Sequence, residues 1–178
     1  MPGFPTGPGK KILEQVRRVQ RNHLESDAVE SPLLQYLSFR LNEEWYAVSV
    51  SQLVEILPPP KITRVPSVPD HILGVVNLRG EVLSVIDLKR FFGLNKSDQG
   101  ADQAIVVVEH GGVRTGLLVD SIGDLVNLAS GELSEEPLVP GKSQRGFFEG
   151  AALRDEVLVS IIRLEGILES EGMYSRQG

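Results

Sequence analysis

The chain has 178 residues, of which 41% are hydrophobic, and it carries a formal net charge of −6. This charge argues against a broad nucleic-acid surface, because nucleic-acid affinity rests mainly on Lys and Arg that neutralise phosphates. The absence of cysteine excludes disulfides and cysteine-ligated metals, and no apolar run approaches the roughly 20 residues that cross a bilayer. We therefore expect a cytoplasmic protein with no direct membrane insertion, whose partners are proteins.

Residues 1–33 are predicted to form an N-terminal extension. Residues 1–9 are rich in Pro and Gly and should be disordered, whereas residues 10–24 place apolar side chains at helical spacing with Lys and Arg between them. This pattern predicts a short amphipathic helix, with a linker over residues 25–32. Three placements of the helix stay open: folded back on the body, docked on a partner, or lying on an anionic membrane.

Apolar residues alternate with polar ones from Gln35 onward, and this pattern predicts β-strands. The first half of the body is expected to contain two hairpins, over residues 35–50 and 74–86, with another short strand over residues 62–65. Short helical pieces are expected at residues 51–56, ahead of three consecutive prolines, and at residues 88–92, ahead of Gly93.

The second half repeats this order after a polar stretch, residues 96–103, where we place a boundary between two subdomains. Strands are expected at residues 104–109 and 113–119, a helical piece at 120–124, an irregular connection over 129–146, a terminal helix at 163–170 and a flexible tail at 171–178. In addition, the sequence LRGEVL that starts at Leu78 reappears as LRDEVL from Leu153. An internal repeat of this kind favours two similar small barrels over one sandwich.

The sequence offers no catalytic or metal-binding constellation. Its three histidines, His23, His71 and His110, are scattered without a metal-ligand spacing, and the Gly-Lys-Ser at residues 141–143 lacks the first glycine and the preceding strand of a phosphate-binding loop. No serine-hydrolase or dinucleotide-binding motif is present. We therefore predict no enzyme activity, no cofactor and no metal.

The informative motif is Asn77-Leu78-Arg79-Gly80, in which the glycine can supply a positive φ and the arginine sets a permanent charge at a hairpin tip. Its neighbours in the chain strengthen the signal: VEI at residues 54–56, RVP at 64–66, GVV at 74–76 and VIDL at 85–88, followed by GLLVD at 116–120 and VLVSI at 157–161. In this order and spacing, the set resembles the CheW family over residues 34–168.

The resemblance implies a mainly β fold of two intertwined five-stranded β-barrels with short helices, spanning residues 34–170. It also implies a non-catalytic scaffold that couples methyl-accepting chemotaxis receptors to a CheA-type histidine kinase, associated with membrane-bound receptor arrays in which other CheW-like proteins take part. Carried over by position, Arg79 would face the receptor in the groove between the barrels and pair with Glu55, with Leu53, Gly74 and Asn77 nearby.

Several alternatives stay open. The N-terminal extension leaves undecided whether the pathway controls flagella, type IV pili or gliding, and a competitor that caps arrays would differ only in its second interface. A small-metabolite-binding β-barrel would reveal itself by a ligand-dependent rise in melting temperature.

Overall fold

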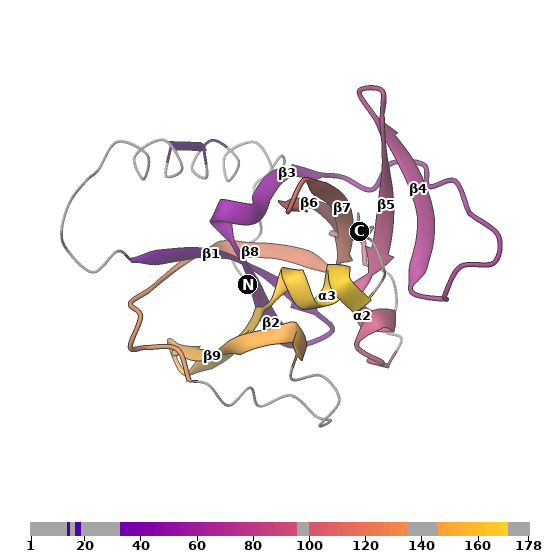
Figure 1. Ribbon diagram of the computed structural model, residues 1–178. Helices are drawn as coiled ribbons and strands as arrows, with labels where there is room; N and C mark the ends of the chain where they lie inside the picture. The colour runs from indigo at the N-terminus through magenta and orange to yellow at the C-terminus, as the bar shows by residue number, and fades with distance from the viewer. Residues whose placement is uncertain (1–13, 15–16, 19–32, 96–99, 135–145, 171–178) are drawn as a thin grey trace.

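The computed structural model describes residues 14, 17, 18, 33–95, 100–134 and 146–170 (Figure 1). Glu14, Arg17 and Arg18 are helical and exposed. The remainder of the predicted extension up to residue 32, and the predicted tail at 171–178, lie outside the described residues.

The described residues form two five-stranded sheets (Figure 1). Sheet A has the strand order β8-β1-β2-β10-β9, and sheet B has the order β3-β6-β7-β5-β4. The strands of sheet A are β1 (Leu34–Leu41), β2 (Glu44–Ser49), β8 (Ser121–Leu128), β9 (Phe148–Arg154) and β10 (Val157–Ile162). Those of sheet B are β3 (Leu53–Leu57), β4 (Ile72–Leu78), β5 (Glu81–Asp87), β6 (Ala104–His110) and β7 (Val113–Val119).

The two sheets are related by the internal repeat. Strands β1 to β5 correspond in order to β6 to β10, and each sheet takes two strands from one repeat and three from the other. The intertwined arrangement is thus confirmed. The polar stretch at 96–103 separates the two repeats but not the two sheets, because β3 to β7 lie in one sheet across it. The pairings also leave both sheets open, since no ladder among the described strands joins β8 to β9 or β3 to β4.

Two of the predicted helical pieces are wrong. Only Val50–Gln52 forms a 3₁₀ turn, and the rest of the first segment continues as β3, which pairs with β6. The segment expected to be helical at residues 120–124 instead begins β8, which pairs with β1. Both segments are short and receive their backbone hydrogen bonds from the other repeat, a long-range pairing that overrides local propensity. The strand expected at 62–65 is reduced to one isolated bridge, between Thr63 and Val75.

The predicted hairpins, the helical turn expected at residues 88–92 and the terminal helix are confirmed. Helix α2 (Leu88–Phe91) begins at Asp87, whose carboxylate accepts hydrogen bonds from the Lys89 and Arg90 amides. It is followed by Gly93 at φ +68°. Helix α3 (Leu164–Ser170) buries Leu164, Ile167 and Leu168 in the core between the two sheets (Figure 1).

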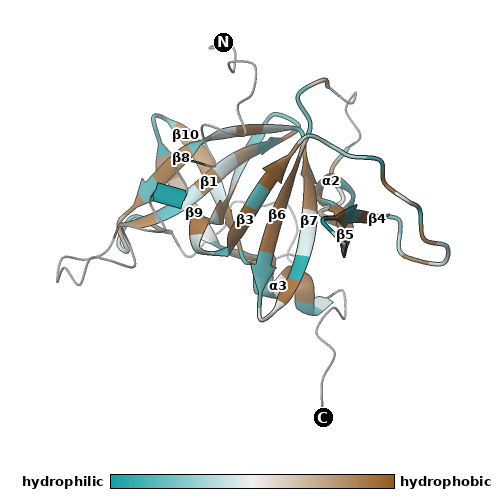
Figure 2. Cartoon of the chain, turned by 90° about the horizontal axis from the view of Figure 1, so that it is seen from above, coloured by the Kyte–Doolittle hydropathy of each residue, from teal (hydrophilic) through white to brown (hydrophobic). Residues whose placement is uncertain are grey.

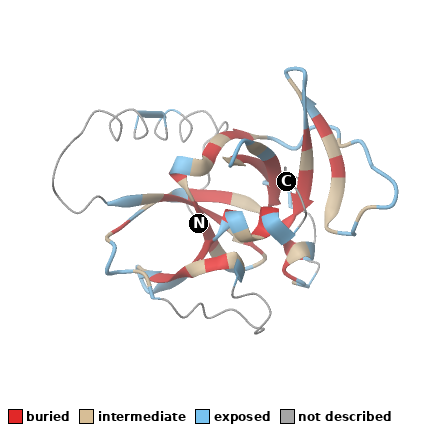
Figure 3. Ribbon diagram, in the orientation of Figure 1, coloured by how far each residue is buried: buried red, intermediate tan, exposed pale blue. Residues whose placement is uncertain are grey.

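The main core joins the two sheets, and each sheet has a smaller core of its own. The main core includes Leu37 and Val48 from sheet A and Val106 and Leu117 from sheet B. Figure 3 shows the buried residues along the strands of both sheets, and Figure 2 shows the hydrophobic run along β6. This packing joins the two sheets that carry the hairpin tips.

Candidate functional site

Arg79, at the tip of the β4–β5 hairpin, forms an ion pair with Glu55 on β3. Its Nη1 donates to Oε2 of Glu55 at 3.0 Å, and its Nη2 donates to Oε1 at 2.7 Å. The predicted pairing is therefore confirmed, with the two parallel hydrogen bonds that give Arg–carboxylate pairs their geometric specificity. Because β3 and β4 are the two edge strands of sheet B, the pair links opposite edges of one sheet.

The two members of this pair differ in exposure. The Glu55 side chain is 10% exposed, whereas that of Arg79 is 74% exposed. A carboxylate removed from water needs partners for its oxygens, and Arg79 supplies one hydrogen bond to each. The outer side of the guanidinium stays open to solvent, so the pair presents an oriented cation on the surface.

The hairpin turn places Arg79 in that position. Arg79 has φ +52° and Gly80 has φ +84°, as a two-residue turn of type I′ requires. The Asn77 side-chain oxygen accepts a hydrogen bond from the Gly80 amide at 3.0 Å. Asn77 is exposed and shapes the tip, so the structure brings together Asn77, Arg79 and Glu55 as the sequence suggested.

Gly74 lies within β4, away from the tip, where the backbone of the preceding loop packs closely against it. It has φ +142°, and a Cβ at this position would stand 2.1 Å from the carbonyl oxygen of Thr63. The backbones of Thr63 and Val75 exchange two hydrogen bonds, of 2.9 and 2.8 Å. Glycine is thus required because the preceding loop crosses β4 at close range.

Leu53 is a core residue. It is 4% exposed and belongs to the main core between the sheets. Its role as a partner contact stays a prediction, and the structure assigns it the task of anchoring β3, the strand that carries Glu55.

Sequence reasoning missed a second group of charges beside the tip. Arg114 on β7 donates from Nη1 to Glu81 at 3.0 Å and from Nε to Glu109 on β6. These hydrogen bonds raise the pKa of the Arg114 guanidinium, with Glu109 the larger cause. All three side chains are exposed at the same end of sheet B. Glu109 and Arg114 flank a predicted turn, so the hairpin register could have paired them, whereas Glu81 required the parallel β5–β7 pairing.

No cluster of three His, Cys, Asp or Glu side chains that could hold a metal occurs in the described part of the chain. Within the same residues, no helix is long and apolar enough to span a membrane.

Comparison with known proteins identifies the domain. The model of the CheW family, described as a CheW-like domain, matches residues 35–172. The chain belongs to the CheW family. It is 29% identical to the chemotaxis protein CheW of Helicobacter pylori over 162 residues, which cover 91% of this chain and 96% of that protein. It is 31% identical to the CheW of Bacillus subtilis over 137 residues, which cover 77% of this chain and 88% of that protein.

A solved structure and a further sequence relative agree with this membership. The crystal structure of the scaffolding protein TtCheW from Thermoanaerobacter tengcongensis is similar, with a TM-score of 0.68, 32% identity, and coverage of 74% of this chain and 90% of that one. The chain also resembles protein PilI of Pseudomonas aeruginosa, at 30% identity over 100 residues that cover 56% of each chain. The CheW fold expected from the sequence is therefore confirmed, and the chain is a chemotaxis-type adaptor domain.

Proposed function

We propose that the protein is a non-catalytic scaffold that couples methyl-accepting chemoreceptors to a CheA-type histidine kinase. The observation that carries this proposal is the bidentate Arg79–Glu55 pair at a hairpin tip of a CheW domain, with an arginine that is 74% exposed. The receptor is the partner that we assign to this tip.

The geometry suits recognition of a protein surface. Arginine has five N–H donors, and Glu55 occupies one on each terminal nitrogen. The remaining donors can bind a carboxylate or main-chain carbonyl of a receptor helix while Glu55 keeps the fork oriented. Such a pre-organised arginine loses less side-chain freedom on binding than a freely rotating one, which is one reason why arginine is enriched among residues that dominate interface affinity.

The proposed mechanism makes and breaks no bond and uses no cofactor. The scaffold fixes the geometry between receptor and kinase, and a second surface holds the kinase, or another CheW-like protein in an array ring. The protein would then be cytoplasmic and associated with membrane-bound receptor arrays.

The test is co-sedimentation with receptor-containing membranes in the presence of a CheA-type kinase. Wild type should bring the kinase into the pellet, and Arg79→Glu should stay in the supernatant, because the new carboxylate faces Glu55. Arg154→Glu is a matched control, since Arg154 forms a similar two-bond ion pair, with Glu132, at the tip of the other hairpin.

Retention of the Arg154→Glu variant by the receptor membranes, together with loss of Arg79→Glu, would support both the function and the site. Equal pelleting of Arg79→Glu and wild type would overturn the receptor assignment of the tip. Failure of wild type to bind either partner would overturn the coupling function.

The similarity to PilI keeps a second candidate open, an adaptor of a pathway other than flagellar chemotaxis, such as one for type IV pili or gliding. Deleting the gene and scoring swimming against surface motility separates the two. A competitor that caps arrays would bind receptor or kinase singly, so formation of the ternary complex excludes it.

A further inference from the structure

The chain passes between the two sheets at two crossings. Among the described strands, β2 in sheet A is followed by β3 in sheet B, and β7 in sheet B is followed by β8 in sheet A. The first crossing is the 3₁₀ turn Val50–Gln52, and the second is the single residue Asp120. Both crossings contact the other repeat: Gln52 Nε2 lies 3.1 Å from His110 Nδ1, and the Asn42 amide donates to Asp120. Contacts at these two places can therefore set the relative position of the sheets.

Asp120 lies at the centre of a set of polar contacts. Its Oδ1 lies 2.7 Å from Nζ of Lys89, and its Oδ2 accepts the hydrogen bond from the Asn42 amide at 2.7 Å. Its own amide donates to the carbonyl oxygen of Arg40 at 3.0 Å. The Asn42 side chain in turn donates to the carbonyl oxygen of Asn95, just beyond α2, at 2.9 Å. These contacts connect α2, the second crossing and the β1–β2 turn.

The ion pair in this set is largely removed from water. The side chains of Lys89 and Asp120 are only 10% and 17% exposed. The attraction within such a pair often only offsets the hydration that both charges lose, so replacing both by neutral groups of similar shape often leaves stability unchanged. Loss of one partner alone is strongly destabilising, because the other charge stays buried and unpaired. A charged hydrogen bond is also directional, so the pair is satisfied at one relative position of its partners.

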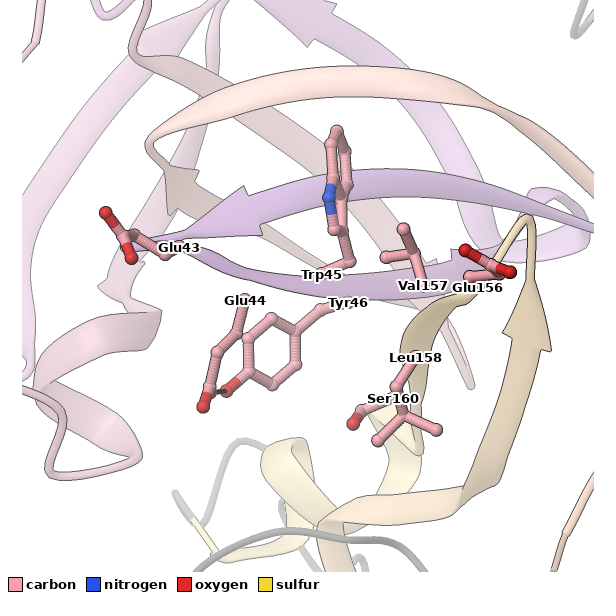
Figure 4. Close-up of a pocket in the computed structure, with 8 residues that line it drawn as sticks. All are labelled: Glu43, Glu44, Trp45, Tyr46, Glu156, Val157, Leu158 and Ser160. Atoms are coloured by element: carbon pink, nitrogen blue, oxygen red, sulfur yellow. Dashed lines mark hydrogen bonds between the residues drawn. The ribbon is translucent and has the colours of Figure 1, made fainter.

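Helix α2 links this position to both sheets. It follows β5 of sheet B without a linker, because Asp87 is the last residue of β5 and also the cap of α2. Phe92, at its end, packs on sheet A, with ring centroids 5.9 Å from Tyr46 of β2 and 5.0 Å from Phe148 of β9. Figure 4 shows that Tyr46 leaves β2 on the face opposite to Trp45. Burial of these rings is favourable over a range of relative positions, because the hydrophobic effect is non-directional.

We propose that the Lys89–Asp120 pair fixes the relative position of the two sheets and adds little to the stability of the fold. The shared apolar core holds the sheets together, and the ion pair selects one arrangement of α2 and the β1–β2 turn at the second crossing. The Arg79 tip of sheet B is thereby held in one position relative to the tip of sheet A. This role goes beyond the coupling function, and its test needs neither receptor nor kinase.

The absence of cysteine allows spin labels to be placed at chosen positions. Val82→Cys on β5 and Leu153→Cys on β9 are suitable sites, because the native side chains are 63% and 66% exposed. Double electron-electron resonance then measures the distribution of distances between the two sheets, and urea unfolding measures the stability of each variant. The labelled parent chain should give a single narrow distance peak.

Lys89→Met with Asp120→Asn removes both charges while keeping the shape of the pair. Methionine is similar in length to the lysine stem, and asparagine keeps an oxygen for the Asn42 amide. This double variant should unfold at a urea concentration close to that of the parent, whereas Lys89→Met alone should unfold at a lower one. The distance peak of the double variant should nevertheless broaden or split in two.

Two further variants complete the test. Arg114→Met with Glu109→Gln removes an exposed ion pair within sheet B, on the strand beside the label on β5, and should leave the peak unchanged. Asn42→Gly keeps the main-chain amide and tolerates the φ of +56°, but it loses the contact with Asn95 and should broaden the peak in a folded protein.

An unchanged peak in both the double variant and Asn42→Gly would overturn the proposal. Broadening that occurs only in variants as unstable as Lys89→Met alone would also overturn it, because the peak would then report a weaker fold.

Discussion

Arg79 and Glu55 join the two edges of sheet B, from the end of β4 to the facing β3. Sheet A has a similar contact, in which Arg154 at the end of β9 donates to the main-chain oxygen of Asn127 on β8 and to Glu132 beyond it. In both sheets an arginine at a hairpin tip thus spans the gap between two edge strands that no ladder among the described strands joins. In sheet B this arginine is the more exposed of the two, at 74% against 35%.

The first prediction concerns the energy of the Arg79–Glu55 pair. Arg79→Ala should destabilise the protein by about 1–2 kcal/mol, more than the loss of an exposed ion pair, because it leaves the nearly buried Glu55 carboxylate without these two hydrogen bonds. Glu55→Gln with Arg79→Ala should be more stable than Arg79→Ala alone, since the buried charge is then gone. Urea unfolding of wild type, Arg79→Ala, Glu55→Gln and the double variant measures the coupling energy between the two side chains.

A coupling energy of zero would show that the two charges are solvated independently. Among these Arg79 and Glu55 variants, the affinity for the receptor should not change in parallel with the free energy of unfolding. The double variant should remain unable to bind although its fold is largely restored, which separates the interface role of Arg79 from its role in the fold.

The second prediction compares two glycines of the same hairpin. Gly74→Ala should be strongly destabilising, by about 3 kcal/mol or more, because the new Cβ would collide with the Thr63 backbone and the φ of +142° is unfavourable for alanine. Gly80→Ala should cost only about 1–2 kcal/mol, since its φ is positive but no atom lies within 4 Å of its Cβ position. Thermal unfolding provides the comparison, with Gly100→Ala as the control that has neither problem. Equal losses at Gly74 and Gly80 would contradict the packing role of Gly74.

Much of this architecture was predictable because local patterns specify it. The alternation of apolar and polar residues predicted the hairpins, and Gly93 predicted the end of α2. The similarity of LRGEVL to LRDEVL predicted two similar halves. The pairing of β3 with β6 and of β8 with β1 was not predictable from local pattern, because each of these partner strands belongs to the other repeat.

The two repeats correspond differently in sequence and in structure, and the two correspondences differ by one residue. The sequence aligns Arg79 with Arg154, but the positive-φ turn residues Arg79 and Gly80 correspond to Asp155 and Glu156. Gly74 and Gly150, each packed against a carbonyl oxygen of the preceding loop, follow the same shifted correspondence. Arg154 therefore precedes the turn that Arg79 occupies, although both arginines contact the opposite edge of their sheet.

The third prediction concerns Asn77, which holds the Gly80 amide. Asn77→Asp keeps an acceptor at this position and should retain receptor binding. Asn77→Ala loses the hydrogen bond, at a cost of about 0.5–1.5 kcal/mol, and should weaken binding by loosening the turn that presents Arg79. Titration calorimetry with a receptor fragment measures the affinity, and hydrogen exchange at the Gly80 amide reports the turn. Weaker binding without faster exchange would mean that Asn77 itself contacts the receptor.

The fourth prediction is a pH dependence at the tip of sheet A. Hydrogen bonds from Arg154, and then from the Ala129 amide, hold the pKa of Glu132 below its usual 4.5. A carboxyl whose pKa is lower in the folded state stabilises the fold fully above its unfolded pKa and loses that contribution as pH falls through the folded value. The contribution should therefore be constant near neutrality and decline below about pH 4.5. In Arg154→Gln, the NMR-detected pKa of Glu132 should rise toward 4.5, and the acid limb of the stability curve should flatten relative to wild type. Arg79→Gln is the matched control, because it removes the corresponding arginine of sheet B and should leave the titration of Glu132 unchanged.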